Sequence, residues 1–537
     1  MDTTQSRRQF LTFFGRTTLT AAALTSVGKT FSIADTLELW DQADSGLPFT
    51  PLPPVRKDDV VLAKGFNYEV LAKFGDPLAE GVSFGTHNDY TAFVPFHKEN
   101  PTDGLLWVNH EYTHPLFVSG YTGGEKTREQ VETEMKSVGG SILRIRKEGA
   151  KWQIVTGDKH NKRIDALTEI PFAWPEPIAG SDKAMGTLAN CAGGITPWGT
   201  VLTCEENYDG FYGETEYVNE ERRKMYNGAL DWEQYYDNPP EHYGWVVEVN
   251  PKEGTARKLV SLGRCAHECA TLYRQPDGTC VVYTGDDAND ECLYKFISAR
   301  PDDLTEGRLY VADMENGRWI SLQLEDQEVL RETFATQTDV LVRLREAARL
   351  VGGSRLARPE DIEIDPVTGA VIVALTNNKP RGNYHGTILR IDEGPDKTTL
   401  SFESSILLAG GPETGFACPD NLAFDLKGNL WFTSDISGSE IGKSPYEAFG
   451  NNSLFYVPMK GGQAGRVCRV ASAPTDAEFT GPTFLPDGQT LMLCVQHPGE
   501  RSPSLHRLTS HWPEGGDAVP KSGIILISGP ALTSMMS

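Results

Sequence analysis

A recurring segment constrains the fold of this chain more than any other sequence feature. Each copy begins with a glycine-containing turn, continues through a short run of apolar or β-branched residues and ends in a cluster of polar side chains. The turn glycines of the six copies are Gly104, Gly199, Gly278, Gly369, Gly428 and Gly488. A strand that leaves a tight turn pairs with the strand that enters it, so the pattern predicts six β-hairpins.

Six such hairpins in one chain are typical of a β-propeller, whose blades bury their apolar faces against their neighbours around a central channel. The turn glycines are 59 to 95 residues apart, which is more than a four-stranded blade needs. We therefore predict an all-β fold, a six-bladed β-propeller with long inserted loops and short helices. A β-sandwich or a pair of β domains is the alternative.

The N-terminal residues are typical of an export signal. Paired arginines in Ser6-Arg7-Arg8-Gln9-Phe10-Leu11 precede a modestly apolar stretch and a small-residue cleavage site that ends at Ala34. This predicts a twin-arginine signal peptide at residues 1–34, with an N-terminal amphipathic helix as the alternative. Residues 35–537 are then expected to form a single β-propeller catalytic domain, periplasmic or secreted.

The charge of the chain limits its partners. It has 50 Lys and Arg against 74 Asp and Glu, a formal net charge of −24. This surplus repels phosphate backbones and argues against nucleic acid as the main ligand. No segment after the signal reaches the about 18 apolar residues of a membrane-spanning helix. We expect a monomer with no integral membrane segment, which meets the export machinery and small molecules.

A second set of polar residues begins the strand that enters each turn. Cys191 precedes Gly199, and Asp420 precedes Gly428. The two open ends of a hairpin lie at the same end of a sheet, so each cluster lies beside the polar finish of its own hairpin. All of the clusters are therefore expected to surround one mouth of the channel.

So many acids around one mouth would repel each other strongly unless cations lay among them. The acids concerned are Glu111, Glu205, Glu206, Glu268, Asp286, Asp287, Glu360, Asp420, Asp435 and Glu478. Carboxylate and amide oxygens, such as that of Asn88, suit Ca²⁺, whereas the thiolate of Cys191 favours a transition metal such as iron or zinc. Gly193 and Gly194 allow the backbone to approach a ligand or metal closely. Solvated strand ends and a buried structural thiol are the alternatives.

Arg358 is the basic residue best placed to reach the acidic mouth, because it lies two residues before Glu360 and residues two apart on a strand share a face. An arginine among bound cations needs an anion, and a phosphoryl group would satisfy both. An ordinary ion pair is the alternative. The sequence contains no P-loop, no G-x-S-x-G elbow and no Rossmann fingerprint, which disfavours nucleotide hydrolases, serine esterases and nicotinamide enzymes.

In these residues the chain resembles the PhoX-type alkaline phosphatases, an exported bacterial family built on a six-bladed β-propeller. The resemblance is carried by short motifs in order along nearly the whole chain: Asn88-Asp89-Tyr90, Asn109-His110-Glu111-Tyr112, Asn190-Cys191-Ala192-Gly193-Gly194, Cys204-Glu205-Glu206-Asn207, His267-Glu268, Gly285-Asp286-Asp287, Arg358-Pro359-Glu360-Asp361, Pro419-Asp420-Asn421 and Glu478-Phe479-Thr480-Gly481-Pro482.

The resemblance implies an exported phosphatase that hydrolyses phosphate monoesters at a cluster of calcium and iron (Fe³⁺) ions in the channel mouth. Arg358 would be the catalytic residue that stabilises the transition state. Cys191 would bind iron, with Glu268 and Glu360 completing its surroundings. The other expected metal ligands are Glu111, Glu205, Asp420, Glu478, Asn88 and Asp287.

Two alternative functions stay open. Residues 419–431 are similar to the calcium-dependent propeller lactonases and organophosphate hydrolases, which would bind no iron and would leave Cys191 and Arg358 unexplained. A non-enzymatic periplasmic propeller would bind a partner and use calcium only for stability.

Overall fold

The computed structural model describes residues 46–97, 99–218 and 221–537. It separates into two units, residues 1–50 and 51–537, and the second unit contains the fold discussed below. The predicted signal peptide, residues 1–34, lies outside the described residues.

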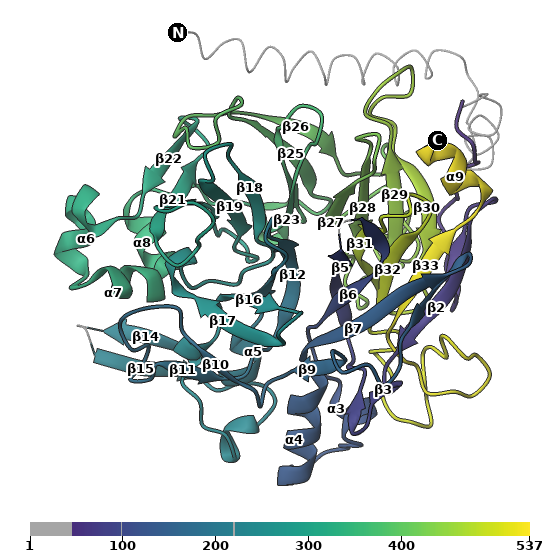
Figure 1. The fold of residues 1–537 in the computed structure, drawn as a ribbon, viewed down its shortest axis with the longest axis horizontal. Helices are drawn as coiled ribbons and strands as arrows, with labels where there is room; N and C mark the ends of the chain where they lie inside the picture. Colours follow the sequence, from purple (N-terminus) through teal and green to yellow (C-terminus); the bar gives the residue numbers. More distant parts are fainter. Residues whose placement is uncertain (1–45, 98, 219–220) are drawn as a thin grey trace. The chain divides into compact units, whose positions relative to one another are not determined.

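The second unit is a six-bladed β-propeller, as the hairpin pattern predicted (Figure 1). Blade 1 comprises β5 (Asn88–His97), β6 (Asn100–His110), β7 (Gly139–Glu148), β8 (Lys151–Ile154) and β9 (Lys162–Ile164). Blade 2 comprises β12 (Asn190–Ile195), β13 (Val201–Glu205), β16 (Val246–Asn250) and β17 (Thr255–Leu259). Blade 3 comprises β18 (Thr271–Arg274), β19 (Cys280–Gly285), β20 (Leu293–Ser298), β21 (Gly307–Asp313) and β22 (Arg318–Ser321).

The other three blades follow in chain order, and the last is completed from the N-terminal side. Blade 4 comprises β23 (Pro359–Ile364), β24 (Val371–Leu375), β25 (Thr387–Asp392) and β26 (Glu403–Ala409). Blade 5 comprises β27 (Pro419–Phe424), β28 (Leu430–Ser434), β29 (Ser453–Val457), β30 (Cys468–Ser472) and β1 (Val61–Leu62). Blade 6 comprises β31 (Glu478–Phe484), β32 (Leu491–Gln496), β33 (Gly523–Ser528) and β2 (Asn67–Lys73).

Pairing of β2 with β33 closes the ring, because it joins a strand near the start of the unit to the last strand of the chain. The predicted hairpins are the two inner strands of each blade. Every residue of β13, β24 and β32 is buried. These strands are mostly apolar because both faces of a blade pack on its neighbours. Trp107 and Ile142 of blade 1, for example, pack in one core cluster with Val247 and Val249 of blade 2.

The predicted inserted loops carry short helices and small hairpins between the blade strands. The helices are α3 (Pro115–Val118), α4 (Arg128–Ser137), α5 (Asp209–Tyr212), α6 (Glu328–Thr333), α7 (Gln337–Val342), α8 (Leu344–Leu350) and α9 (Pro530–Met536). The small hairpins are β3 (Pro77–Ala79) with β4 (Val82–Ser83), β10 (Glu169–Pro171) with β11 (Lys183–Met185), and β14 (Glu214–Val218) with β15 (Glu221–Tyr226). Among the described residues no helix has both the length and the apolar character needed to cross a membrane.

Candidate functional site

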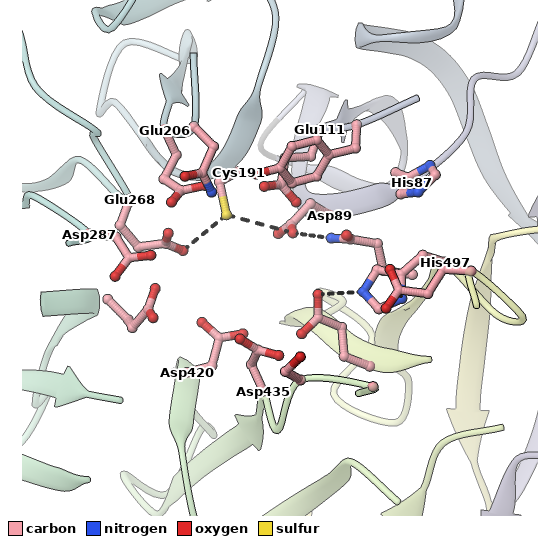
Figure 2. A pocket seen from close by; sticks show the side chains of 18 of the residues that line it. His87, Asp89, Glu111, Cys191, Glu206, Glu268, Asp287, Asp420, Asp435 and His497 are labelled. Atoms are coloured by element: carbon pink, nitrogen blue, oxygen red, sulfur yellow. Dashed lines mark hydrogen bonds and ion pairs between the residues drawn. The ribbon is translucent and has the colours of Figure 1, made fainter. Parts of the chain in front are cut away.

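The starts and ends of the inner strands meet around one pocket with a volume of about 430 Å³. Figure 2 shows acidic side chains that point into it from all sides. The acids that line it are Asp89, Glu111, Glu206, Glu268, Asp287, Glu360, Asp420, Asp435, Glu478 and Glu500. Within the described part of the chain, Arg358 is the one Arg or Lys side chain among the lining residues.

The structure brings most of the predicted site residues together here. Arg358, Cys191, Glu111, Glu268, Asp287, Glu360, Asp420 and Glu478 all line the pocket. Glu205 and Asn88 do not, although each is next in sequence to a residue that does. The hairpin ends therefore converge as the pattern predicted, and local backbone geometry selects which side chains enter.

Glu205 is turned into blade 2, away from the pocket. Its Oε1 accepts a hydrogen bond from Lys258 Nζ at 2.6 Å, and its Oε2 accepts one from the Trp245 N–H at 3.1 Å. Both charged side chains are fully buried. Successive residues on a strand point to opposite faces, so the next residue, Glu206, enters the pocket instead.

The side chains of Asn88 and Asp89 also point in different directions, one into a blade and the other into the pocket. The Asn88 amide nitrogen lies 2.9 Å from His110 Nδ1, inside blade 1. Asp89 lines the pocket, where its Oδ2 accepts a hydrogen bond from Gln496 Nε2 at 2.5 Å. The sequence motif contains both residues and we named Asn88 as the expected ligand, whereas Asp89 is the one that lines the pocket.

Irregular strand pairing accompanies the pocket residues in four of the inner hairpins. The register shifts at Asn88/Thr91, Asn190/Gly193, Pro359/Ile362 and Pro419/Leu422. These four shifts enclose the pocket residues Asp89, Cys191, Glu360 and Asp420. A bulge adds a residue to one strand and re-aims its side chains, which is why simple alternation does not predict the lining.

The paired glycines after Cys191 serve strand packing rather than approach to a ligand. A Cβ on Gly193 would lie 2.1 Å from the Leu202 carbonyl oxygen, and one on Gly194 would lie 2.1 Å from the Ala270 carbonyl oxygen. Side chains at both positions would therefore collide with backbone of the partner strand and of the adjacent blade. The glycines let β12 sit close enough to its neighbours to place Cys191 at the pocket wall.

Cys191 is the centre of a set of close ligand atoms. Its Sγ lies 3.2 Å from Glu268 Oε1 and 3.8 Å from Asp89 Oδ2 (Figure 2). Three groups each have ligand atoms within 4.8 Å of one another: Asp89, Glu111 and Cys191; Cys191, Glu206 and Glu268; Glu268, Asp287 and Glu360. Cys191 and Glu268 are each shared by two groups, so the three groups form one continuous series.

Several carboxyl groups of the pocket and its thiol bind protons more tightly than the same groups do in water. Burial and neighbouring carboxylates raise the pKa of Asp89 to about 7 and that of Glu478 to about 8. The same two causes hold the pKa of Glu111, Glu268 and Asp420 well above the ordinary carboxyl value. Burial also raises the pKa of the Cys191 thiol, with Asp89 adding to the effect. A bound cation would reverse this balance and favour the ionised ligands.

Arg358 lies among these acids and is held by two of them. Its Nε and Nη2 donate to the two carboxylate oxygens of Asp287 at 2.9 and 2.7 Å, and Nη2 lies 2.9 Å from Glu360 Oε1. Its side chain retains 25% of its accessible surface. This geometry leaves part of the guanidinium available to an anion in the pocket.

Sequence reasoning left the end of the sixth hairpin out of the site, although the repeat pattern marked it. Gln496 and His497 follow β32 and line the pocket. His497 Nε2 lies 3.0 Å from Glu478 Oε1, and Nδ1 lies 2.8 Å from the Asp476 carbonyl. Burial alone would lower the pKa of His497, but Glu500 and Glu478 outweigh it and raise the pKa. His497 therefore stabilises the ionised form of Glu478.

The neighbouring histidines have different roles. His87 lines the pocket, whereas His110 and His267 do not. His267 Nε2 lies 2.8 Å from the Gly263 carbonyl and Nδ1 lies 2.8 Å from the Thr284 hydroxyl. These contacts fix the segment that leads to Glu268.

Comparisons with known proteins agree with this geometry. The family model described as alkaline phosphatase PhoX matches residues 47–499. The solved structure of Pseudomonas fluorescens PhoX, in complex with vanadate as a transition state analogue, is similar with a TM-score of 0.81 and 28% sequence identity; the match covers 90% of this chain and 98% of that chain.

Other similarities are weaker. A luciferin-regenerating enzyme matches with a TM-score of 0.32 and 11% identity, covering 87% of this chain and 96% of that one. A Dyadobacter fermentans protein of unknown function matches with a TM-score of 0.37 and 10% identity, covering 89% and 100%. No curated protein matches the chain. The family match spans most of the chain and includes every lining residue of the pocket except Glu500. The chain therefore belongs to the PhoX alkaline phosphatase family.

Proposed function

We propose that this protein is an exported alkaline phosphatase that hydrolyses phosphate monoesters in the pocket at the ends of the inner strands. One observation carries the proposal: in a chain of the PhoX family, ten acids and one thiol surround a single partly accessible guanidinium. Cations bound by the acids, together with Arg358, would complement the charge of a phosphoryl group.

The donor set fits metal ions. Asp89 Oδ1 and Glu206 Oε1 are buried and have no hydrogen-bond partner among the described residues. Buried carboxylate oxygens without partners are costly, and coordination to a cation satisfies them. The oxygen-rich groups suit Ca²⁺, and the thiol of Cys191 suits Fe³⁺.

The ligand set we propose extends the predicted one. Cys191, with Glu268 and Glu360 nearby, would hold iron, and Glu111, Asp287, Asp420 and Glu478 would hold calcium or complete the shared groups. Asp89 and Glu206 are added because they lie in the same ligand groups. Glu205 and Asn88 stay predictions from the motifs. In the structure Glu205 accepts hydrogen bonds from Lys258 and Trp245, and Asn88 forms hydrogen bonds with His110 and Gly85.

The positions of Arg358 and Asp287 in the pocket suggest the part that each would play in the reaction. When bound, the metal ions would supply Lewis-acid activation of the phosphoryl oxygens and of the attacking water. Arg358 would donate hydrogen bonds to the equatorial oxygens, where negative charge grows in the transition state. Asp287 would fix the orientation of the guanidinium, since it contacts Nε and Nη2. The remaining nitrogen, Nη1, lies 3.9 Å from Asp435 Oδ2.

Export through the twin-arginine pathway is part of the proposal. It carries folded proteins, so the metal ions could be acquired before the protein crosses the membrane. All nine cysteines are free and buried, which suits a chain that folds in a reducing compartment. The mature protein would be periplasmic or secreted.

The test is hydrolysis of p-nitrophenyl phosphate by protein exported through its own pathway, with elemental analysis of the same sample. We expect bound calcium and iron, loss of turnover when a calcium chelator is added and recovery when calcium is returned. Calcium without iron and without turnover would contradict the proposal and favour a propeller lactonase or a binding propeller.

A further inference from the structure

The loop between β19 and β20, residues 286–292, holds Arg358 in two ways. Asp287 in this acidic loop accepts two hydrogen bonds from the Arg358 guanidinium. The loop also pairs with the backbone just before Arg358, where the Leu356 N–H donates to the Glu291 carbonyl at 2.8 Å. The position of the guanidinium therefore depends on the position of the acidic loop.

The backbone of Arg358 shows why it needs such support. Its φ is +53°, in the left-handed region that is unfavourable for residues with a side chain. Such a conformation persists only when the surrounding structure imposes it. Here the Arg358 carbonyl accepts a hydrogen bond from the Thr376 N–H at 3.1 Å, and the bridge between Asn289 and Ala357 fixes the residue before it.

The acidic loop is in turn held by helix α8, which belongs to the insertion after blade 3. Arg345 and Arg349 are four residues apart and share one face of this helix. Arg345 donates from Nε and Nη2 to the two oxygens of Asp286 at 2.8 and 2.6 Å, and Arg349 pairs with Glu291. The Asp286 side chain is fully buried, and the two-point contact with Arg345 provides its counter-ion.

Asp286 also fixes the segment that carries Glu268. Its Oδ1 accepts a hydrogen bond from the Ala266 N–H at 3.2 Å, and the Asp287 N–H donates to the Ala266 carbonyl at 2.9 Å. Asp286 is adjacent to Asp287 in the chain. The Asp286 carboxylate, which Arg345 contacts from outside the pocket, therefore connects both Arg358 and Glu268 to helix α8. Asp287 and Glu268 are labelled in Figure 2.

We propose that Arg345 is a positioning residue for the phosphatase reaction, acting through Asp286 and the acidic loop on Arg358. The inference rests on the proposed function of the pocket. A guanidinium holds a carboxylate in a fixed plane through two parallel hydrogen bonds, whereas an ammonium holds it only as a point charge. Loss of this fork lets the loop rotate, and small displacements of a group that contacts the reacting atoms slow the reaction.

The test uses Arg345→Lys, which keeps a positive charge opposite the buried Asp286 and removes only the fork. We expect kcat for p-nitrophenyl phosphate to fall about tenfold. Vanadate binding measured by calorimetry should weaken by a similar factor, while bound metal and the melting temperature stay as in the wild type. Arg331→Gln in the same insertion is the matched control and should change none of these, because among the described residues the Arg331 side chain donates to the backbone carbonyls of Leu324 and Glu325.

A double-mutant cycle separates positioning from a general structural effect. In an Arg358→Ala background, Arg345→Lys should cause no further loss of kcat, because the residue through which it acts is gone. A further tenfold loss there, wild-type kcat and vanadate affinity in Arg345→Lys alone, or activity that falls only in proportion to bound metal would each overturn the inference.

A second variant covers the case in which Arg345→Lys folds poorly. The pair Asp286→Asn with Arg345→Gln removes both charges, leaves no buried ion unpaired and should give the same tenfold loss. Wild-type kcat in this folded pair would overturn the inference. A wild-type protein that hydrolyses no phosphate ester would instead overturn the proposed function itself.

Discussion

The buried acids of the blades and those of the pocket are neutralised in different ways. Inside the blades, two buried glutamates each have a lysine of their own: Glu205 contacts Lys258 Nζ at 2.6 Å, and Glu393 contacts Lys295 Nζ at 2.7 Å, with all four side chains fully buried. Among the described residues that line the pocket, ten acids share one arginine.

The difference shows where the protein depends on its surroundings. The fold supplies Glu205 and Glu393 with counter-ions, as the cost of an unpaired buried charge requires. In the pocket, burial and repulsion between neighbouring carboxylates hold the pKa of Glu111, Glu206 and Glu268 well above the ordinary carboxyl value. The predictions below use this contrast.

Removing the one arginine of the pocket should give the largest effect. We expect Arg358→Ala to lower kcat by about 10²–10³, because the guanidinium would no longer stabilise charge on the phosphoryl oxygens. Steady-state kinetics on phosphate esters measure this. Arg274→Ala, which breaks an exposed pair with Asp302, is the control and should leave kcat unchanged. Equal kcat in Arg358→Ala and wild type would place catalysis elsewhere.

Neutralising one glutamate of the Glu205–Glu206 pair at a time compares the two regions directly. Glu205→Gln should lower the free energy of unfolding by roughly 3 kcal/mol, because it leaves the Lys258 ammonium buried without a counter-ion. Glu206→Gln should not destabilise the metal-free protein, since it removes one of several repelling acids, but it should reduce bound metal and turnover.

Denaturant unfolding with elemental analysis measures both effects. Adding Lys258→Met to Glu205→Gln should restore much of the lost stability, because no buried charge then stays unpaired. If Glu205→Gln instead released metal without loss of stability, Glu205 would belong with the pocket ligands after all.

The pH dependence of stability should give the smallest effect. In the metal-free folded state the pKa of Asp89 is about 7 and that of Glu478 about 8, both above the values of an unfolded chain. At these two groups the folded state binds protons more tightly than the unfolded state. Their contribution to stability is therefore fully present below about pH 4 and is lost as the pH rises to about 8.

Thermal unfolding of chelator-treated and metal-loaded protein across this range measures the effect, and the difference between the two isolates the pocket. The loaded protein should lose less stability, because its cations keep the carboxylates ionised without repulsion. Parallel curves for the two samples would contradict a metal-binding role for these acids.

Much of this architecture was readable from the chain. The recurring turn glycine, apolar run and polar cluster predict the six hairpins, because each strand is short and its buried character is written in its own residues. Hairpin geometry places the two clusters of each hairpin together, and the convergence of all the clusters follows once the hairpins are the inner strands of a propeller. Arg358 and Cys191 were identified because an arginine and a thiol are unusual among so many acids.

The sequence did not determine which member of each acidic pair enters the pocket. Asp89 and Glu206 line it, while Asn88 and Glu205 face the blade interiors. A shift of one residue exchanges the two faces of a strand, and a bulge such as that at Asn88/Thr91 produces such a shift. Whether a bulge forms depends on pairing with the partner strand and on packing against the next blade.

The sequence by itself determined the repeat, the hairpins and the chemistry gathered at their ends, because these depend on local pattern and composition. The tertiary structure alone decided the direction in which each side chain points. It also decided that Arg345 contacts Asp286, 59 residues away in the chain, in the loop that holds Arg358. Contacts of this kind connect segments with no shared pattern, and only the packing of the α8 insertion against blade 3 brings them together.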